Sequence, residues 1–282
     1  MTRQLWIALV LMLFVGTATA GGPEEVRKQI ESTMLLTGTI DLDAAGRVER
    51  YTLDHRKKLS EPVVRLLARS VPQWRFEPVL VKGQATAARS HMSLRLVASK
   101  LDDGDYNLQI HGAQFHPSPS DTSTARHRLT PPAYPKPAAR AGAGGTVYVV
   151  LKVTPDGRIE DAAVEQVNLR IVTSEHLMAG WRKMLSKAAL RATKTWMVTT
   201  PAGELDKPYW SARVPVEFIA PNQRSAQDDE RDQEWHAYVP GPRQPIPWMP
   251  DSIGSSAADA LGAGGVYPVD AGLRLLTVLD EN

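Results

Sequence analysis

Residues 146–153, TVYVVLKV, form a strongly apolar, β-branched run that ends at the turn sequence PDG of residues 155–157. An apolar run of this length beside turn residues predicts a buried strand. Apolar residues return at alternate or neighbouring positions over 159–167, which predicts a second strand. The stretch therefore indicates a β-hairpin at the start of a domain.

A helix and a third strand follow this hairpin. Ser174 is a suitable N-cap, and apolar residues then recur at three- and four-residue steps. The predicted stripe consists of Leu177, Trp181, Met184, Ala188 and Ala192. Beyond Trp196 and a turn at 202–204, Val214, Val216 and Phe218 alternate with polar residues or proline. The order strand, strand, helix, strand predicts an α+β fold in which a small antiparallel sheet carries one helix on a face.

The same ββαβ pattern occurs earlier in the chain, which indicates an internal repeat. Gly46 aligns with Gly157, and Trp74 aligns with Trp196. Residues 92–96 align with the strand at 214–218, and between the two anchors the later copy has roughly eleven more residues, about three helical turns. After a turn at 102–105, Tyr106, Leu108 and Ile110 predict an additional fourth strand that folds back on 92–96. We therefore expect a first module over 21–116 and a second over 131–220.

The N-terminus has the three parts of a secretory signal. Arg3 is followed by an apolar run from Leu5 to Val15, and Ala18 and Ala20 occupy the −3 and −1 places of a cleavage site. The run has roughly a dozen residues, whereas a membrane-spanning helix needs about 20. We expect residues 1–20 to be a cleaved signal peptide and the mature protein to be periplasmic. The alternative is an uncleaved segment that anchors the protein in the inner membrane.

Two other segments have little apolar periodicity. Residues 117–130 are rich in Pro, Ser and Thr and are expected to be a linker. Residues 221–282 form a polar, Pro-rich tail, in which residues 273–278 have the composition of a terminal strand.

Composition excludes several classes of function. The formal net charge is only +2, and basic residues are scattered, which argues against a nucleic-acid partner. The chain has no cysteine, so disulfides, thiol nucleophiles and cysteine metal sites are excluded. His111 and His116 are poorly spaced for a shared metal site, and no hydrolase or phosphate-binding motif occurs. We expect no catalytic site, metal, cofactor or small-molecule substrate.

The second module closely resembles the TonB C-terminal domain family. The resemblance is carried by an ordered set of residues over about ninety positions, and Val198 departs from it because the family usually has Phe there. The set comprises Tyr134, Pro135, Gly145, Asp156 and Gly157, the Ala-rich helix into Trp196, and the strand Val214-Pro215-Val216-Glu217-Phe218. The first module is a weaker match, which keeps Trp74, Phe76 and Pro78 but lacks the Tyr-Pro lead-in.

This resemblance implies a non-enzymatic module that binds a protein partner by β-strand addition. Family members pair their last strand with an extended segment of an outer-membrane transporter, which places the partner-binding edge at Val214, Val216 and Phe218. The tail segment 273–278 is expected to compete for that edge as a removable cover. Trp74 and Trp196 are expected to be core residues. Two alternatives stay open: a structural scaffold or edge-mediated homodimer, and a cell-wall-binding accessory protein.

Overall fold

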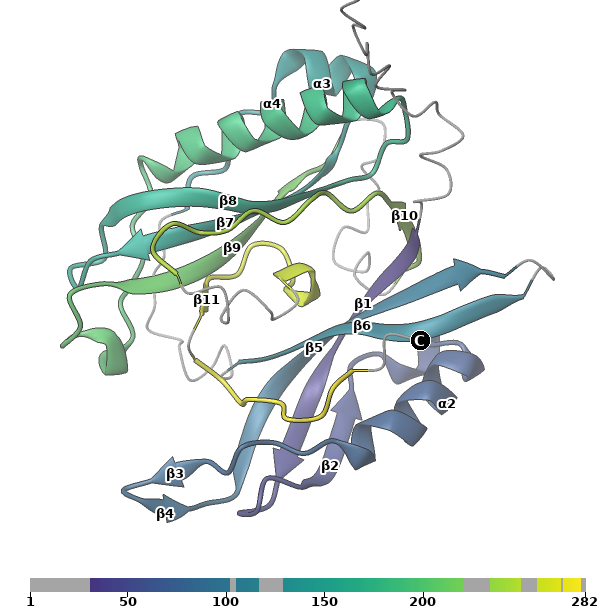
Figure 1. The fold of residues 1–282 in the computed structure, drawn as a ribbon, viewed down its shortest axis with the longest axis vertical. Helices are drawn as coiled ribbons and strands as arrows, with labels where there is room; N and C mark the ends of the chain where they lie inside the picture. Colours follow the sequence, from purple (N-terminus) through teal and green to yellow (C-terminus); the bar gives the residue numbers. More distant parts are fainter. Residues whose placement is uncertain are drawn as a thin grey trace, which may run out of the picture.

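The computed structural model describes residues 31–101, 105–116, 129–220, 234–249, 258–269 and 271–279. The predicted signal peptide and residues 117–128 of the predicted linker lie outside these ranges. The described residues form four layers in the order helix, sheet, sheet, helix, so that the two sheets face each other (Figure 1). The predicted α+β class with two ββαβ modules is confirmed.

The first module contains an antiparallel sheet with one helix on its outer face. Its elements are β1 (Glu31–Leu42), β2 (Val48–Leu53), α2 (Glu61–Ser70), the small hairpin β3 (Leu80–Val81) and β4 (Gln84–Ala85), β5 (Ala88–Lys100) and β6 (Tyr106–His116). β1 pairs with both β2 and β5, and β6 pairs with the other side of β5. The predicted fourth strand therefore occupies the outer side of the third strand, as expected.

The second module repeats this arrangement around a longer helix. Its elements are α3 (Lys136–Ala141), β7 (Gly145–Val153), β8 (Ile159–Leu169), α4 (Glu175–Thr193) and β9 (Trp210–Phe218). β7 lies in the middle, between β8 and β9. The core between sheet and helix combines alternate residues of β7 and β9 with Met178, Leu185 and Ala189 of α4. The helix is where the sequence places it, and four residues of the predicted stripe, Trp181, Met184, Ala188 and Ala192, pack against this core. Its fully buried line is displaced by one residue from the stripe, because Leu177 is 49% exposed and Met178 is buried instead.

The repeat extends to the pairing register of the strands. Leu36 lies opposite Leu94 in the first module, and Val147 lies opposite Val216 in the second. These are equivalent pairs under the sequence alignment. The turns agree as well: Gly46 has φ 76°, Gly157 has φ 84°, and a Cβ at either position would approach a backbone oxygen to 2.1 or 2.2 Å. The same turn conformation therefore starts the second strand of both modules.

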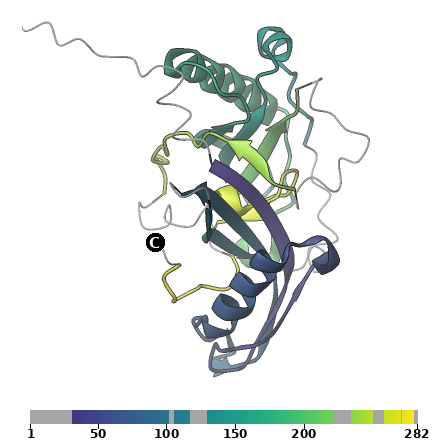
Figure 2. The same ribbon diagram turned by 90° about the vertical axis from the view of Figure 1, so that its right-hand side faces the viewer.

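The described parts of the tail run across both modules (Figure 2). β10 (His236–Tyr238) pairs with β1, and the next residue, Val239, forms a bridge with Leu169 of β8. Residues 258–261 are buried. β11 (Tyr267–Pro268) then pairs with β9, and Leu275 forms a bridge with Phe76 of the first module. The tail thus connects the two modules through their sheets.

Candidate protein-binding edge

Strand β9 pairs with the centre of the second module along its whole length. Its nine residues pair with β7 in unbroken antiparallel register, from Trp210 opposite Val153 to Phe218 opposite Gly145. Val214, Val216 and Phe218 are 2%, 6% and 3% exposed and belong to the core on the helix side. Their side chains therefore anchor the strand, and contact with a further strand would use backbone groups of the residues between them.

The backbone groups on the outer side of β9 can be assigned from one hydrogen bond. The Val269 N–H donates to the Ser211 carbonyl at 2.9 Å, so Ser211 faces away from β7. In an antiparallel strand the N–H and C=O of one residue point to the same side, and the side alternates along the chain. Arg213, Pro215 and Glu217 therefore also face outward. These four residues define the β9 edge, in which Pro215 offers a carbonyl but no N–H.

Most of the β9 edge is occupied by residues 264–269, which we call the cover segment. Tyr267 pairs with Arg213, and Pro268 pairs with Ala212. The Gly264 N–H donates to the Pro215 carbonyl at 3.3 Å, and the Val269 bond completes the contact at the other end. A tail cover was predicted, but at residues 273–278, and that location was wrong.

Residues 273–279 lie on the first module instead. Leu273, Leu275 and Leu279 pack against the core of that module. The Leu276 N–H donates to the Arg75 carbonyl at 2.8 Å, and the Glu77 N–H donates to the Arg274 carbonyl at 3.0 Å. The physical reason is the short helix α2, which has 10 residues where α4 has 19 and leaves apolar surface for the tail to cover.

A buried ion pair fixes β9 relative to β8. Glu165 is the extra residue of a bulge in β8, since Gln166 pairs with Tyr148 and Val164 with Val149. Its carboxylate accepts bonds from Arg213 Nε at 2.8 Å and Arg213 Nη2 at 3.1 Å. The two side chains are only 2% and 3% exposed. Two parallel bonds to one carboxylate offset part of the cost of burying both charges, and they constrain the orientation of Arg213.

Arg243 of the tail also reaches this pair, with Nη2 at 3.2 Å from a Glu165 carboxylate oxygen. The Gln244 N–H donates to the Glu165 carbonyl at 2.7 Å. Together with the Val239–Leu169 bridge, these contacts place the tail along β8, at the opposite side of the sheet from β9.

The space between the two sheets is filled by side chains and by residues 258–261. Tyr148 is 3% exposed there, and burial raises the pKa of its hydroxyl above the ordinary value because the phenolate would be poorly solvated. Arg95 of β5 donates to the Asp259 carbonyl and, at 3.1 Å, to Thr33 Oγ1. The cavity beside these residues measures about 30 Å³, which is too small for more than a water molecule.

Of the residues that carry the family resemblance, Pro215 and Glu217 lie on the β9 edge, whereas the motif residues outside β9 lie near the ends of β7 and β9. The Tyr134 hydroxyl donates to the Ala143 carbonyl at 3.0 Å, and its ring lies 5.7 Å from that of Phe218. Pro135 precedes helix α3, and Gly145 begins β7 directly opposite Phe218. These residues support one end of β9.

Asp156 and Gly157 form the turn at the opposite end of β7. The Thr154 hydroxyl bonds to the Asp156 carboxylate at 2.5 Å, and this bond is the main cause of the lowered pKa of Asp156. The Val198 N–H donates to the Gly157 carbonyl at 2.9 Å. The turn therefore ties the second strand to the segment that follows the helix.

Trp74 and Trp196 occupy equivalent core positions. Trp196 is 4% exposed, and its indole N–H donates to the Thr130 carbonyl at 2.8 Å. Trp74 is 3% exposed and packs edge to face on Phe115, with ring centres 5.9 Å apart. Each indole lies between the helix and the sheet of its own module.

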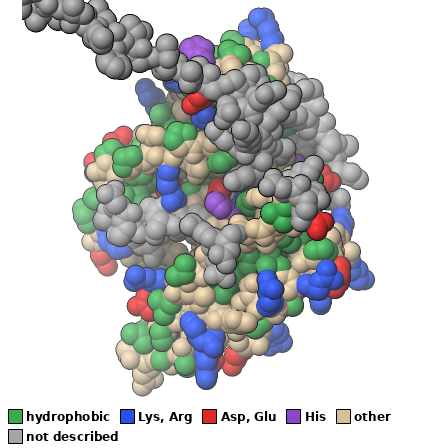
Figure 3. Space-filling view, turned by 45° about the vertical axis from the view of Figure 1, so that its right-hand side comes forward, with side chains coloured by type: hydrophobic (Ala, Val, Ile, Leu, Met, Phe, Trp, Pro, Cys, Tyr) green, Lys and Arg blue, Asp and Glu red, His purple; other side chains and the backbone are tan. Residues whose placement is uncertain are grey.

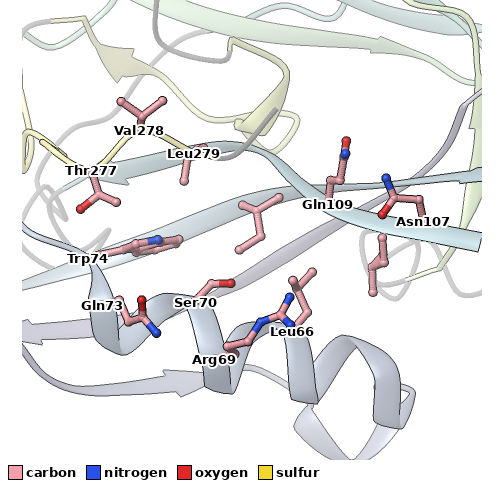
Figure 4. A pocket seen from close by; sticks show the side chains of 12 residues that line it. Leu66, Arg69, Ser70, Gln73, Trp74, Asn107, Gln109, Thr277, Val278 and Leu279 are labelled. Atoms are coloured by element: carbon pink, nitrogen blue, oxygen red, sulfur yellow. The ribbon is translucent and has the colours of Figure 1, made fainter. Parts of the chain in front are cut away.

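The first module contains a larger hollow, of about 340 Å³ (Figure 4). It lies between α2, β6 and residues 277–279, with Trp74 on one side and Arg69 on another. Its walls combine leucine and isoleucine with amide side chains. Within the described ranges no group of three His, Asp or Glu side chains is placed to hold a metal ion.

On the face in Figure 3, basic side chains are spread over both modules and interspersed with acidic ones. Such a distribution differs from the single basic stripe that binds nucleic acid. In the part of the chain that the structure describes, no helix combines the length and apolar composition needed to cross a membrane.

Sequence reasoning missed the ion pair and the position of the cover segment. Glu165 and Arg213 each stand among apolar residues in a strand, and this pattern was a usable signal that the second face of the sheet is also buried. Residues 266–269, VYPV, have strand-like composition, but a proline in so short a run gave no reason to prefer them over 273–278.

Comparison with known families gives one match, to the family described as Gram-negative bacterial TonB protein C-terminal, over residues 130–219. Comparisons with curated proteins and with solved structures give no match. The matched range begins at the lead-in that holds the Trp196 indole and ends just after β9. The family is non-catalytic, and the match implies a TonB-like protein-interaction module of the cell envelope. The chain therefore contains a TonB C-terminal domain at residues 130–219.

Proposed function

We propose that the domain at residues 130–219 binds an extended segment of another envelope protein by β-strand addition at the β9 edge. The partner class is an outer-membrane transporter or another protein of the cell envelope, and the site of action is the periplasm. Main-chain hydrogen bonds would supply affinity, and alternate side chains would supply selectivity. No cofactor, metal or catalytic residue takes part.

One observation carries this proposal: the two sides of β9 are paired to very different extents. Nine residues pair with β7 on the inner side, whereas the ladder with β11 on the outer side has two. In the first module the equivalent side of β5 pairs with ten residues of β6. An incompletely paired strand at a sheet margin is a template for another strand. Only the second module offers such a template at this position.

The proposal can be tested by site-specific photo-crosslinking in living cells or in envelope extract. A benzophenone side chain would replace Ser211 or Glu217, two partly buried residues whose backbone groups lie on the β9 edge, and one at Leu177 would lie on the exposed side of α4 as a control. We expect adducts with a discrete envelope protein from the first two positions and not from the third. Equal adducts from all three positions, or none with any other protein, would contradict the proposal.

A second function, self-association, is favoured by strand β6. Among the described elements β6 ends its sheet, and its eleven residues include no Lys, Arg, Asp, Glu or Pro, the residues that usually blunt strand edges. Sedimentation velocity of the purified protein tests this reading. It predicts a dimer. Tyr106 is 62% exposed, and Tyr106→Lys should convert the dimer to a monomer. A monomer at every concentration would exclude it.

A further inference from the structure

The cover segment is placed on β9 as an incoming strand would be. Because Tyr267 pairs with Arg213, the same antiparallel register puts Val266 opposite Val214. Val266 packs against the helix-side core of the second module, in line with the side chains of β9 itself. This position accepts an aliphatic side chain, since the core cluster that it joins is made of apolar residues.

The next residue lies on the other face of the sheet. The ring of Tyr267 packs edge-on against His116 of β6, with ring centres 5.1 Å apart, and its hydroxyl donates to the Gly262 carbonyl at 3.1 Å. The first module therefore forms one wall of this position. An aromatic side chain suits it because one side of the site is a flat ring and the opposite residue, Arg213, is held by Glu165.

Pro268 lacks an N–H, but this does not remove a hydrogen bond to β9. Val269 faces β9 through its N–H, so the alternation of the strand turns residue 268 away from β9. Proline at that position removes one donor from the outer side of the cover segment, which disfavours the addition of yet another strand. The cover segment thus pairs with β9 and is itself a poor template for a further strand.

Both flanks of the cover segment are anchored. Ala258 and Ala260 are at most 1% exposed between the sheets, and Leu273 and Leu275 pack on the first module. The segment between these anchors contacts β9 through a two-residue ladder and the bonds of Gly264 and Val269. A short contact between fixed anchors can be displaced and can re-form, because the tether keeps its local concentration high.

We propose that residues 264–269 are an internal ligand that occupies the partner's place on the β9 edge. The partner is then an extended protein segment that runs antiparallel to β9, with an aliphatic side chain opposite Val214 and an aromatic side chain opposite Arg213. This inference rests on the proposed function for the location of the partner, but the occupancy of the edge by the chain's own segment is tested separately.

The first experiment uses a labelled synthetic peptide with the sequence of residues 262–269, GAGGVYPV, as the probe. It is titrated into the full chain and into an opened variant, Val266→Asp with Tyr267→Ala, and binding is followed by fluorescence anisotropy. We expect the opened variant to bind the probe at least about tenfold more tightly than the parent, because the parent supplies its own competitor. A matched peptide with the Val269 nitrogen methylated should bind weakly to both, since it lacks the donor to Ser211.

Equal affinity of the two chains for the probe, or of the two peptides for the opened variant, would overturn the inference. A disulfide-locked variant gives a second test that does not depend on correct folding of the opened variant. Val214→Cys with Val266→Cys introduces the chain's only two cysteines, at opposed positions of a non-hydrogen-bonded pair that suits a disulfide. The oxidised chain should bind no probe, and reduction should restore the affinity of the parent.

The same variants separate this inference from the proposed function. If the opened variant binds the probe but its β9 edge still yields no adduct with an envelope protein, the internal ligand stands and the proposed partner class fails. If adducts form equally in the locked, opened and parent chains, the partner binds elsewhere and the cover segment does not regulate it.

Discussion

The two modules share a strand register and a turn, yet they complete their cores differently. The second module has the 19-residue helix α4, and most of its core comes from within residues 129–220. The first has the 10-residue helix α2 and takes Leu273, Leu275 and Leu279 from the tail. It also fills the outer side of its third strand with β6, whereas the second leaves that side to a short segment. The tail thus supplies three core leucines to the first module, and it supplies Val239, Val266 and the cover of the β9 edge to the second.

The tryptophans give the largest expected effect. Trp74→Ala and Trp196→Ala should each destabilise the protein by about 3–5 kcal/mol, as for large aromatic truncations in cores. Trp196→Ala should cost about 1 kcal/mol more, because the Thr130 carbonyl loses its indole donor. Urea denaturation measures the difference. If both variants unfold like the parent, the indoles do not close the helices onto the sheets.

The turn glycines test whether the repeat is physical. Gly46→Ala and Gly157→Ala should destabilise the chain by similar amounts, about 1–3 kcal/mol, because both residues have positive φ and lie against a carbonyl oxygen. Gly180→Ala is the control: it lies in α4 with open space around it, and alanine there should stabilise by about 0.5–1 kcal/mol. Thermal melts measure these effects. If one turn glycine can be replaced without loss of stability and the other cannot, the two turns are not equivalent.

The dependence of the first module on the tail predicts a smaller effect. Leu275→Ala removes a half-buried side chain from the first core and should cost about 1–2 kcal/mol. Leu276 is 56% exposed, so Leu276→Ala should change stability by less than about 0.5 kcal/mol. Hydrogen exchange should report faster exchange in β1 and β5 for the first variant and unchanged exchange in β7. Faster exchange in β7 alone would mean that the tail supports the other module.

The smallest effect concerns acid. In the first module the side-chain bond from Arg89 lowers the pKa of Asp41 below its ordinary value of 3.8, and the equivalent residue of the second module is Lys152. A carboxyl with a depressed folded pKa stabilises the fold above its ordinary pKa and loses that contribution as the pH falls through the folded value. Asp41→Asn should therefore cost less than about 1 kcal/mol at neutral pH, and its cost should become smaller as the pH falls below the ordinary carboxyl pKa. Urea titrations at neutral and acidic pH decide this.

The sequence predicted the strands, the helices and the repeat because each depends on local periodicity and turn residues. It also predicted that β6 fills one edge, since the turn at 102–105 leaves the following strand little choice of neighbour. The displaced buried line of α4 was missed because Leu177 and Met178 are both apolar, and only the packed sheet chooses between them. The cover segment was misplaced because the choice between two apolar tail segments depends on the length of a helix roughly two hundred residues earlier.

The contact between Arg75 and Thr277 also bears on the order in which the two modules fold. The Arg75 N–H donates to Thr277 Oγ1 across 202 residues of sequence. During synthesis from the N-terminus, the first module is made early but cannot gather its last core leucines until nearly the whole of the described chain exists. The second module has its strands β7 to β9 and its helix α4 within residues 130–219, and of the described tail its core takes Val239 and Val266, so it can close earlier. Contacts of long sequence separation form slowly, so the module made second is expected to finish folding first.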